Sequence, residues 1–337
     1  MDNYAYLNAR VSILASNLLS EIELSKFLEQ DSLPMLDDEL NKLLNDEKLS
    51  ITLIEQTWLI KTLADFQVLL RPLSMTARNL LLYWFRKYDI ANLKTILHGK
   101  ITGLDANAIS RKLLDLGSLT SLPVKQLLRS ENIGELLRQL EHSSYSNIAR
   151  QARRVLEKEH QLYSLDATID RYYMLGFIQH VMALDTVQRK HILPLINIFI
   201  DRFNLLWLLR YRFAYNLSAA ETYYLLIPAS FRLNSTLLQK LVELDSLVEV
   251  IENLPEPFYR LLAGVENTFA ADQKLIQELR KVADITLKLH SFTLAKVFAY
   301  ILLREMEIHK IMAILKAKKL ALNKDIISEI AEYSYVI

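Results

Sequence analysis

The chain has 337 residues and is poor in residues that break helices, with 6 Gly and 7 Pro, while leucine makes up about a fifth of it. Doubly wound nucleotide-binding folds need glycines at their phosphate turns, and all-β folds need Gly or Pro at a turn about every 8–12 residues. Both classes are therefore excluded. With 51% hydrophobic and 23% charged residues, the chain can bury a large core and is not disordered.

The charges nearly cancel, since 40 Lys+Arg against 39 Asp+Glu give a formal net charge of +1. Any attraction to nucleic acid or anionic lipid would therefore have to come from a local patch. The chain has no cysteine, which excludes disulfides and thiolate metal sites and is compatible with a reducing cytoplasm.

Targeting and membrane-spanning segments are not predicted. The chain begins with an acidic stretch that lacks the apolar core of a signal peptide. The longest run without a formal charge, residues 172–184, is shorter than the roughly 18 residues that a membrane span requires. We therefore expect a protein without a transmembrane segment, in which such runs are buried helices.

Apolar residues recur every three or four positions along most of the chain, which is the period of one helix face. In chain order this predicts helices over 7–18, 80–97, 172–184, 192–200, 275–282 and 297–306. Breaks are expected at Pro34, Pro72, Gly103, 117–123, Pro228 and 255–257. Pro194 is expected to begin or kink its helix. No alternating strand pattern is present, so the predicted fold class is all-α.

One twelve-residue pattern occurs three times without gaps, at 89–100 (box 1), 201–212 (box 2) and 307–318 (box 3). Each box has an acid first, apolar residues at positions five, eight and nine, and a basic residue at position twelve. We expect the apolar positions to lie in the core, among them Leu93, Ile96, Leu205, Leu208, Ile311 and Ile314. A long repeat of this kind predicts related helical units.

The similarity extends beyond the boxes. Residues 128–145 match 242–259 at a constant offset, and the N-terminal leucines of 28–40 match residues 128–140. The third copy lacks its own downstream part, which the N-terminus would supply. We therefore predict three helical lobes, 50–160, 161–264 and 265–337 plus 1–49, in a closed pseudo-threefold ring rather than an open solenoid.

Box 1, Asp89–Lys100, resembles the signature of the C-type subunit of prokaryotic A-type/V-type rotary ATPases, whose eukaryotic equivalent is the d-type subunit. The resemblance covers nearly the whole chain. It implies a non-catalytic central-stalk adaptor shaped as a funnel of three lobes, peripheral on the cytoplasmic face of the membrane. Its base would sit on the rotor ring of proteolipid subunits, and its mouth would receive the central shaft of D- and F-type subunits.

The resemblance implies that such an adaptor transmits torque between shaft and ring during H⁺ or Na⁺ transport coupled to ATP hydrolysis or synthesis. The seven histidines are scattered without a metal-ligand spacing, and the chain has no phosphate-binding glycine loop. We therefore expect no cofactor, no metal, no nucleic acid and no small-molecule substrate. Two alternatives from other classes are a free-standing helical scaffold and, less favoured, a prenyl-transfer-type enzyme. The acidic run Asp37–Glu39 resembles one metal motif of such enzymes, but the second acidic cluster that they need is absent.

Eleven polar residues of the boxes are candidates for a partner interface or for a hydrogen-bond network within the lobes. They are Asp89, Asn92, Lys94, Lys100, Asp201, Asn204, Arg210, Arg212, Glu307, Lys310 and Lys318. The first and fourth positions share a helix face. The basic box ends would either complement the helix dipole or form a collar that attracts an acidic partner. Because Lys310 replaces the asparagine of boxes 1 and 2, we expect box 3 to make different polar contacts.

Exposed aromatic residues are further candidates for interface anchors, because Trp and Tyr are enriched at binding hot spots. The candidates are Trp58, Trp84, Trp207, Tyr223 and Tyr224.

Overall fold

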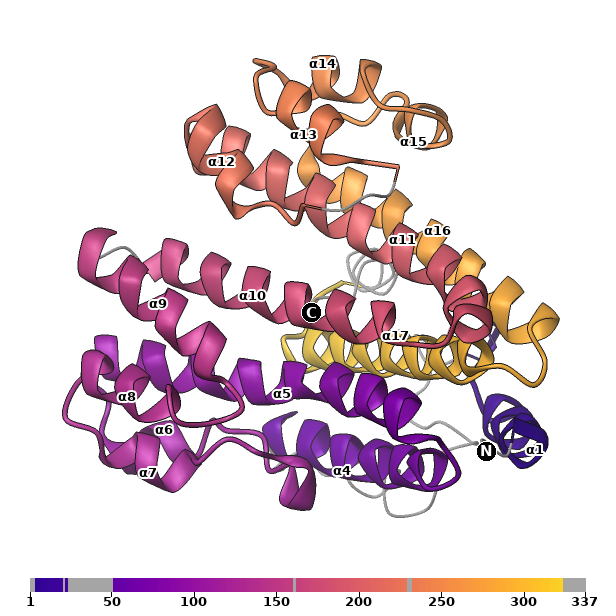
Figure 1. Ribbon diagram of the computed structural model, residues 1–337, viewed down its shortest axis with the longest axis horizontal. Coiled ribbons are helices and arrows are strands. Elements are labelled where there is room, and N and C mark those ends of the chain that lie inside the picture. Colours follow the sequence, from indigo (N-terminus) through magenta and orange to yellow (C-terminus); the bar gives the residue numbers. More distant parts are fainter. Residues whose placement is uncertain (1–3, 21, 24–50, 160–161, 229–231, 324–337) are drawn as a thin grey trace. The chain divides into compact units, whose positions relative to one another are not determined.

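The computed structural model describes residues 4–20, 22–23, 51–159, 162–228 and 232–323. In these ranges the regular secondary structure consists of helices and includes no strand, which confirms the predicted all-α class (Figure 1). The N-terminal leucines of 28–40, the run Asp37–Glu39 and Pro34 lie outside the described residues. The chain divides into two compact units: unit 1 is Met1–Ser74 with Asp185–Ile337, and unit 2 is Met75–Leu184. The division into three lobes remains a prediction.

Unit 2 consists of two long helices joined by a series of shorter ones. Its elements are α5 (Met75–Ile101), α6 (Ala106–Ser110), the 3₁₀ turn η1 (Gly117–Leu119), α7 (Val124–Arg129), α8 (Ile133–Leu140), α9 (Ser146–Glu159) and α10 (Leu162–Met182). Helix α10 packs along α5 and against α9, and α8 packs on α9. Box 1 lies in the second half of α5.

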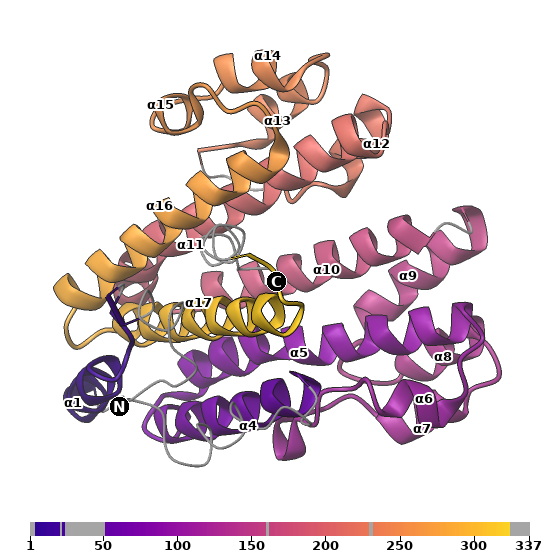
Figure 2. The same ribbon diagram turned by 180° about the vertical axis from the view of Figure 1, so that it is seen from behind.

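Unit 1 contains boxes 2 and 3. Its elements are α1 (Tyr4–Ala15), α4 (Ile51–Leu70), α11 (Thr186–Leu209), the π-helical turn η2 (Arg210–Ala214), α12 (Ala219–Leu225), α13 (Ser235–Leu241), α14 (Leu247–Glu252), α15 (Phe258–Leu262), α16 (Thr268–Leu289) and α17 (Leu294–Lys319). Helix α16 packs along both α11 and α17, while α1 and α4 pack on α17 (Figure 2). Box 2 lies in α11 and η2, and box 3 lies in α17.

Each box helix packs on at least one long helix of its own unit. Helix α10 packs on α5, α16 packs on α11, and α4 packs on α17. We call α4, α10 and α16 the return helices. The six apolar box positions expected in the core are all buried, which confirms that prediction for Leu93, Ile96, Leu205, Leu208, Ile311 and Ile314.

The three box helices end at matching places. Gly103, Asn216 and Ala321 have φ angles of 71°, 54° and 52°, so each has the left-handed conformation that terminates a helix. The following residue is a leucine in each case, and its N–H donates back to a carbonyl of the last helical turn. The span between donor and acceptor is five residues in boxes 1 and 3, but six in box 2, where Leu217 donates to Tyr211 at 2.8 Å. The π turn η2 accommodates this extra residue.

Proline positions mark most of the predicted joints. Pro72 separates α4 from α5, and Pro228 follows α12. Pro194 lies inside α11, which begins earlier, at Thr186, so this proline does not begin the helix. Thr186–Ala214 is the one helix among the described residues that is long and apolar enough to cross a membrane, and 83% of its apolar window is buried inside the protein. Burial of that extent is typical of a core helix.

Candidate functional site

The first box position places a carboxylate under the segment that follows the box helix. Asp89 is buried and accepts three hydrogen bonds. Thr120 Oγ1 and the Tyr145 hydroxyl donate at 2.5 Å each, and the Ser121 N–H donates at 3.0 Å. Both oxygens of Asp89 are therefore satisfied. Burial and the adjacent Asp89 charge raise the pKa of Tyr145.

Asp201 occupies the same position in box 2 but has fewer partners. It accepts the Leu233 N–H at 3.2 Å, while its Oδ2 atom is buried without a hydrogen-bond partner. Tyr259, which the repeat aligns with Tyr145, is exposed. Burial raises the pKa of Asp201 to about 6, because an ionised carboxylate is poorly solvated there.

Glu307 begins box 3 and contacts the N-terminal segment. Its Oε1 atom accepts the Leu19 N–H at 2.5 Å, and its other oxygen pairs with Arg304. Burial raises the pKa of Glu307, and the Arg304 charge opposes that shift. The acid of each box thus accepts a main-chain N–H from outside its helix.

The fourth box position fixes a second segment. The Asn92 carboxamide donates to the Leu114 carbonyl and accepts the Leu114 N–H, both at 2.8 Å. Asn204 makes the same two bonds with Ile227, at 3.0 and 2.8 Å. Both asparagines are buried. Lys310, at this position in box 3, is half-buried and cannot reproduce this pattern, because an ammonium group accepts no hydrogen bond.

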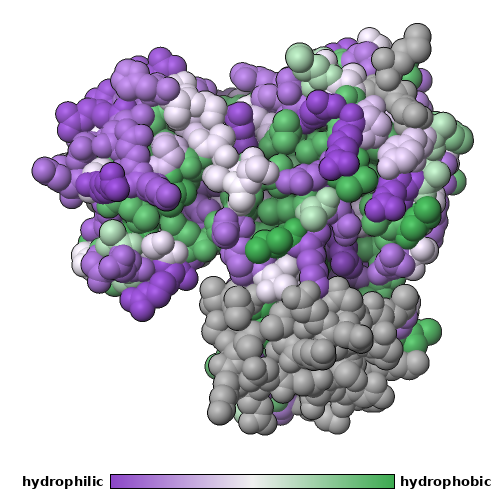
Figure 3. Space-filling view, turned by 90° about the horizontal axis from the view of Figure 1, so that it is seen from below, coloured by the Kyte–Doolittle hydropathy of each residue, from purple (hydrophilic) through white to green (hydrophobic). Residues whose placement is uncertain are grey.

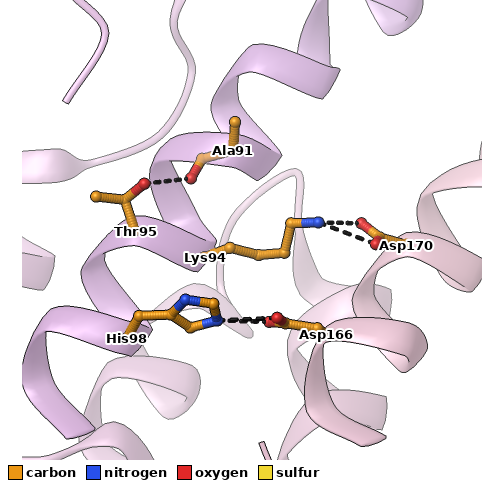
Figure 4. A network of polar contacts seen from close by, with 6 residues as sticks. All are labelled: Ala91, Lys94, Thr95, His98, Asp166 and Asp170. Atoms are coloured by element: carbon orange, nitrogen blue, oxygen red, sulfur yellow. Dashed lines mark hydrogen bonds and ion pairs between the residues drawn. The ribbon is translucent and has the colours of Figure 1, made fainter. Parts of the chain in front are cut away.

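The tenth box position faces an acid on the return helix. His98 Nε2 donates to Asp166 at 2.9 Å (Figure 4). Arg210 lies 3.9 Å from Asp272, and Lys316 pairs with Glu55. The same relation therefore holds between α5 and α10, between η2 at the end of α11 and α16, and between α17 and α4.

Two more ion pairs connect the same helices. Lys94 binds Asp170 at 2.8 Å, one turn along from the His98–Asp166 contact (Figure 4). Burial raises the pKa of Asp170, while the Lys94 charge lowers it. In unit 1, the buried Arg202 binds Asp272 at 2.7 Å.

The twelfth box position supplies cations to main-chain carbonyls. Lys100 donates to the carbonyl of Ser130 at 2.5 Å, and Arg212 donates to that of Leu217 at 2.8 Å. Arg212 also reaches the Leu244 carbonyl at 3.4 Å, and Leu244 is the repeat equivalent of Ser130. Lys318 is half-buried. The basic ends of boxes 1 and 2 therefore have internal partners in addition to any effect of the helix dipole.

Sequence reasoning missed the acidic partners of the tenth position. His98 precedes Asp166 by 68 residues, whereas Arg210 precedes Asp272 by 62, so no fixed spacing connects them. The signal that could have found them was an acid on each return helix. Of the aromatic candidates, Trp58, Trp84 and Trp207 are buried, Tyr223 is half-buried and Tyr224 is exposed.

Among the described residues, no group of three or more His, Asp or Glu side chains is arranged to hold a metal ion. The box side chains form hydrogen bonds and ion pairs that hold loops and neighbouring helices.

Comparison with known proteins places the chain in a family. The sequence model of the family described as ATP synthase (C/AC39) subunit matches residues 7–330. The chain belongs to this family. Its members are subunits of V/A-type, ion-transporting ATPases.

Similar relatives of this C/AC39 chain are each named as the C-type subunit of an A-type ATP synthase. The one from Methanocaldococcus jannaschii is 24% identical, over 94% of this chain and 82% of the relative. That from Methanococcoides burtonii is also 24% identical, over 96% and 93%. That from Thermococcus kodakarensis is 24% identical, over 97% and 89%. The C/AC39 match thus extends over all three boxes.

Proposed function

We propose that this chain is the non-catalytic central-stalk adaptor of a rotary ATPase, which connects the rotor shaft to the membrane ring and transmits torque. Membership of the C/AC39 family carries this proposal. The partners would be D- and F-type shaft subunits and the proteolipid ring, and the chain would be held peripherally on the cytoplasmic side of the membrane through that ring.

The polar contacts of the boxes support a stiff adaptor. A part that transmits torque must not shear between its helices, and each box helix is bonded to its return helix through a cation and an acid, such as Lys94 with Asp170. The buried asparagines Asn92 and Asn204 fix the segments that follow. We propose that the eleven box candidates act first as this internal network, and that the third lobe is completed by the N-terminus through the bond from Leu19 to Glu307.

Affinity purification from solubilised membranes tests the function. The adaptor should recover both shaft and ring subunits, and recovery of neither would refute the proposal. A free-standing scaffold would recover neither the shaft nor the ring subunits.

The role of the box acids needs a separate experiment. A double substitution, Asp89→Ala with Asp201→Ala, should impair folding if these acids form the internal network. A variant that folds normally but binds the shaft weakly would instead make them partner contacts. The collar is tested by salt: if assembly is insensitive to ionic strength, the basic box ends do not attract an acidic partner.

A further inference from the structure

One end of unit 1 exposes large apolar side chains beside lysines. At this end α11 begins, α16 ends, and the α16–α17 turn follows. Leu294 N–H donates to Gln188 at 2.8 Å and the Nδ1 atoms of His191 and His290 lie 3.1 Å apart, so the start of α11 is in contact with the turn. We call residues 185–191 and 288–293 the unit 1 tip.

Three apolar side chains of the unit 1 tip are turned to solvent. Leu289 is 74% exposed, Val187 is 62% exposed, and Phe292 is 57% exposed. Phe292 also has a φ angle of 60°, a left-handed conformation that is rare for a bulky residue outside special sites. Burying these side chains in an apolar phase would be favourable, because each removes most of its hydrocarbon from water.

Cations flank the apolar side chains of the unit 1 tip. Lys190 and Lys288 are exposed, and each is close in sequence to an exposed apolar residue. The tip carries a single acid, Asp185, whose Oδ1 caps α11 by accepting the N–H groups of Val187 and Gln188 at 3.0 Å each, so its cations outnumber its acids. The lysines are therefore the charges best placed to meet a partner, which favours a negatively charged one.

One end of unit 2 also exposes apolar side chains. Helices α5 and α10 run antiparallel, since Lys94 pairs with Asp170 and the later His98 pairs with the earlier Asp166. The start of α5 and the end of α10 therefore lie at one end of unit 2, where Met75 and Met182 are both exposed. Exposed apolar residues are therefore also present where α5 begins and where α10 ends.

We propose that the unit 1 tip contacts an anionic lipid surface, with Val187, Leu289 and Phe292 entering the headgroup region and Lys190 and Lys288 meeting the lipid charges. The cores of protein interfaces are depleted in lysine, whereas apolar side chains next to lysines suit a lipid boundary. On the face drawn in Figure 3, apolar areas are interspersed with polar ones. This inference rests on the proposed function, and it assigns the tip to the end that faces the membrane.

Vesicle flotation of the full chain tests the proposal. The chain should float with phosphatidylcholine vesicles that contain about 30% phosphatidylserine, and much less with phosphatidylcholine alone. The double variant Leu289→Ser with Phe292→Ser should lower binding to the anionic vesicles by about tenfold, since two apolar contacts are lost. Circular dichroism establishes that the variant is folded.

Leu320→Ser is the matched control. Leu320 is 70% exposed and follows the opposite end of α17, so its substitution removes an equally exposed leucine outside the unit 1 tip. This control should float like the wild type. A tryptophan at the tip, from Phe292→Trp, should shift its emission to shorter wavelength on anionic vesicles, a signal that does not depend on the double variant's folding.

Two outcomes would overturn the lipid contact. One is a chain that does not float with anionic vesicles. The other is a tip variant that floats like the wild type, and if that variant also fails to bind the detergent-solubilised ring, the tip is a protein contact. Because flotation uses the isolated chain, a negative result would leave recovery of the shaft and ring subunits unaffected, so failure of the two proposals can be told apart.

Discussion

Asn92 and Leu114 are joined by two hydrogen bonds, through which one carboxamide satisfies both main-chain polar groups of a single residue at 2.8 Å. Asn204 and Ile227 reproduce the arrangement in unit 1. The same solution in two repeats indicates that the fourth box position is a fixation point for the loop.

Asn92→Ala should therefore be strongly destabilising. It leaves the N–H and the carbonyl of the half-buried Leu114 without their protein partner, which costs about 1–3 kcal/mol of unfolding free energy. Urea denaturation followed by circular dichroism measures it. Asn147→Ala, at an exposed position of α9, is the control and should change stability by less than about 0.5 kcal/mol. Equal effects of the two substitutions would contradict the role of Asn92.

Replacing the first-position aspartates by asparagine should change stability in different ways in boxes 1 and 2. Asp89 accepts three hydrogen bonds, so Asp89→Asn should cost about 1–3 kcal/mol by turning one acceptor into a donor. Asp201 has a buried oxygen without a partner, so Asp201→Asn should be neutral or stabilising near pH 7. Chemical denaturation of both variants at neutral pH makes the comparison. A larger loss for Asp201→Asn than for Asp89→Asn would refute this account.

Asp201 should also make stability depend on pH. Its pKa is raised from 3.8 to about 6, so the folded state binds the proton more tightly than the unfolded chain. Stability is then lost as the pH rises from about 4 to above 6, by roughly 2–3 kcal/mol for this one group. The gain in stability on Asp201→Asn should accordingly be larger at about pH 7.5 than at about pH 4.5. A gain that is the same at both pH values would contradict the shift.

Gly176 in α10 should not tolerate a methyl group. A Cβ atom there would lie 1.9 Å from the Tyr83 hydroxyl oxygen, and the Tyr83 ring makes stacking contacts with both Tyr173 and His180. Gly176→Ala should destabilise the protein by about 2–4 kcal/mol, although alanine favours helices by about 1 kcal/mol over glycine. Gly134→Ala in α8 is the control, because its nearest contact would be at 3.3 Å. Thermal unfolding should separate the two variants by several degrees.

At the matching helix ends, a change from alanine to glycine should stabilise the protein, and a change from glycine to alanine should destabilise it. Ala321 has a φ angle of 52°, where a side chain is strained, so Ala321→Gly should stabilise the protein by up to about 1 kcal/mol. Gly103, with a φ angle of 71°, is its repeat equivalent, and Gly103→Ala should destabilise by about 1–2 kcal/mol. Denaturation midpoints that move in the same direction for both variants would refute the equivalence.

Much of the architecture could be read from the sequence because it depends on local patterns. The helical period predicted an all-α chain, and the spacing of acid, apolar and basic residues located three equivalent helices. The extra residue in box 2 is visible in the sequence at Leu217, but only the structure placed it in the π turn η2. The buried asparagines were identified as polar candidates without their partners, since Leu114 and Ile227 contribute only main-chain atoms, which leave no pattern in the sequence.

The sequence by itself determined the fold class, the three boxes and the resemblance to a rotary ATPase family, because periodicity and repeated residue types are properties of neighbours along the chain. Only the tertiary structure decided which acid meets which cation and which apolar residues stay exposed. Asp272 lies 62 residues beyond Arg210, and Leu19 lies 288 residues before Glu307. Such contacts depend on how helices pack, and an apolar residue such as Leu289 has the same identity whether it is buried or exposed.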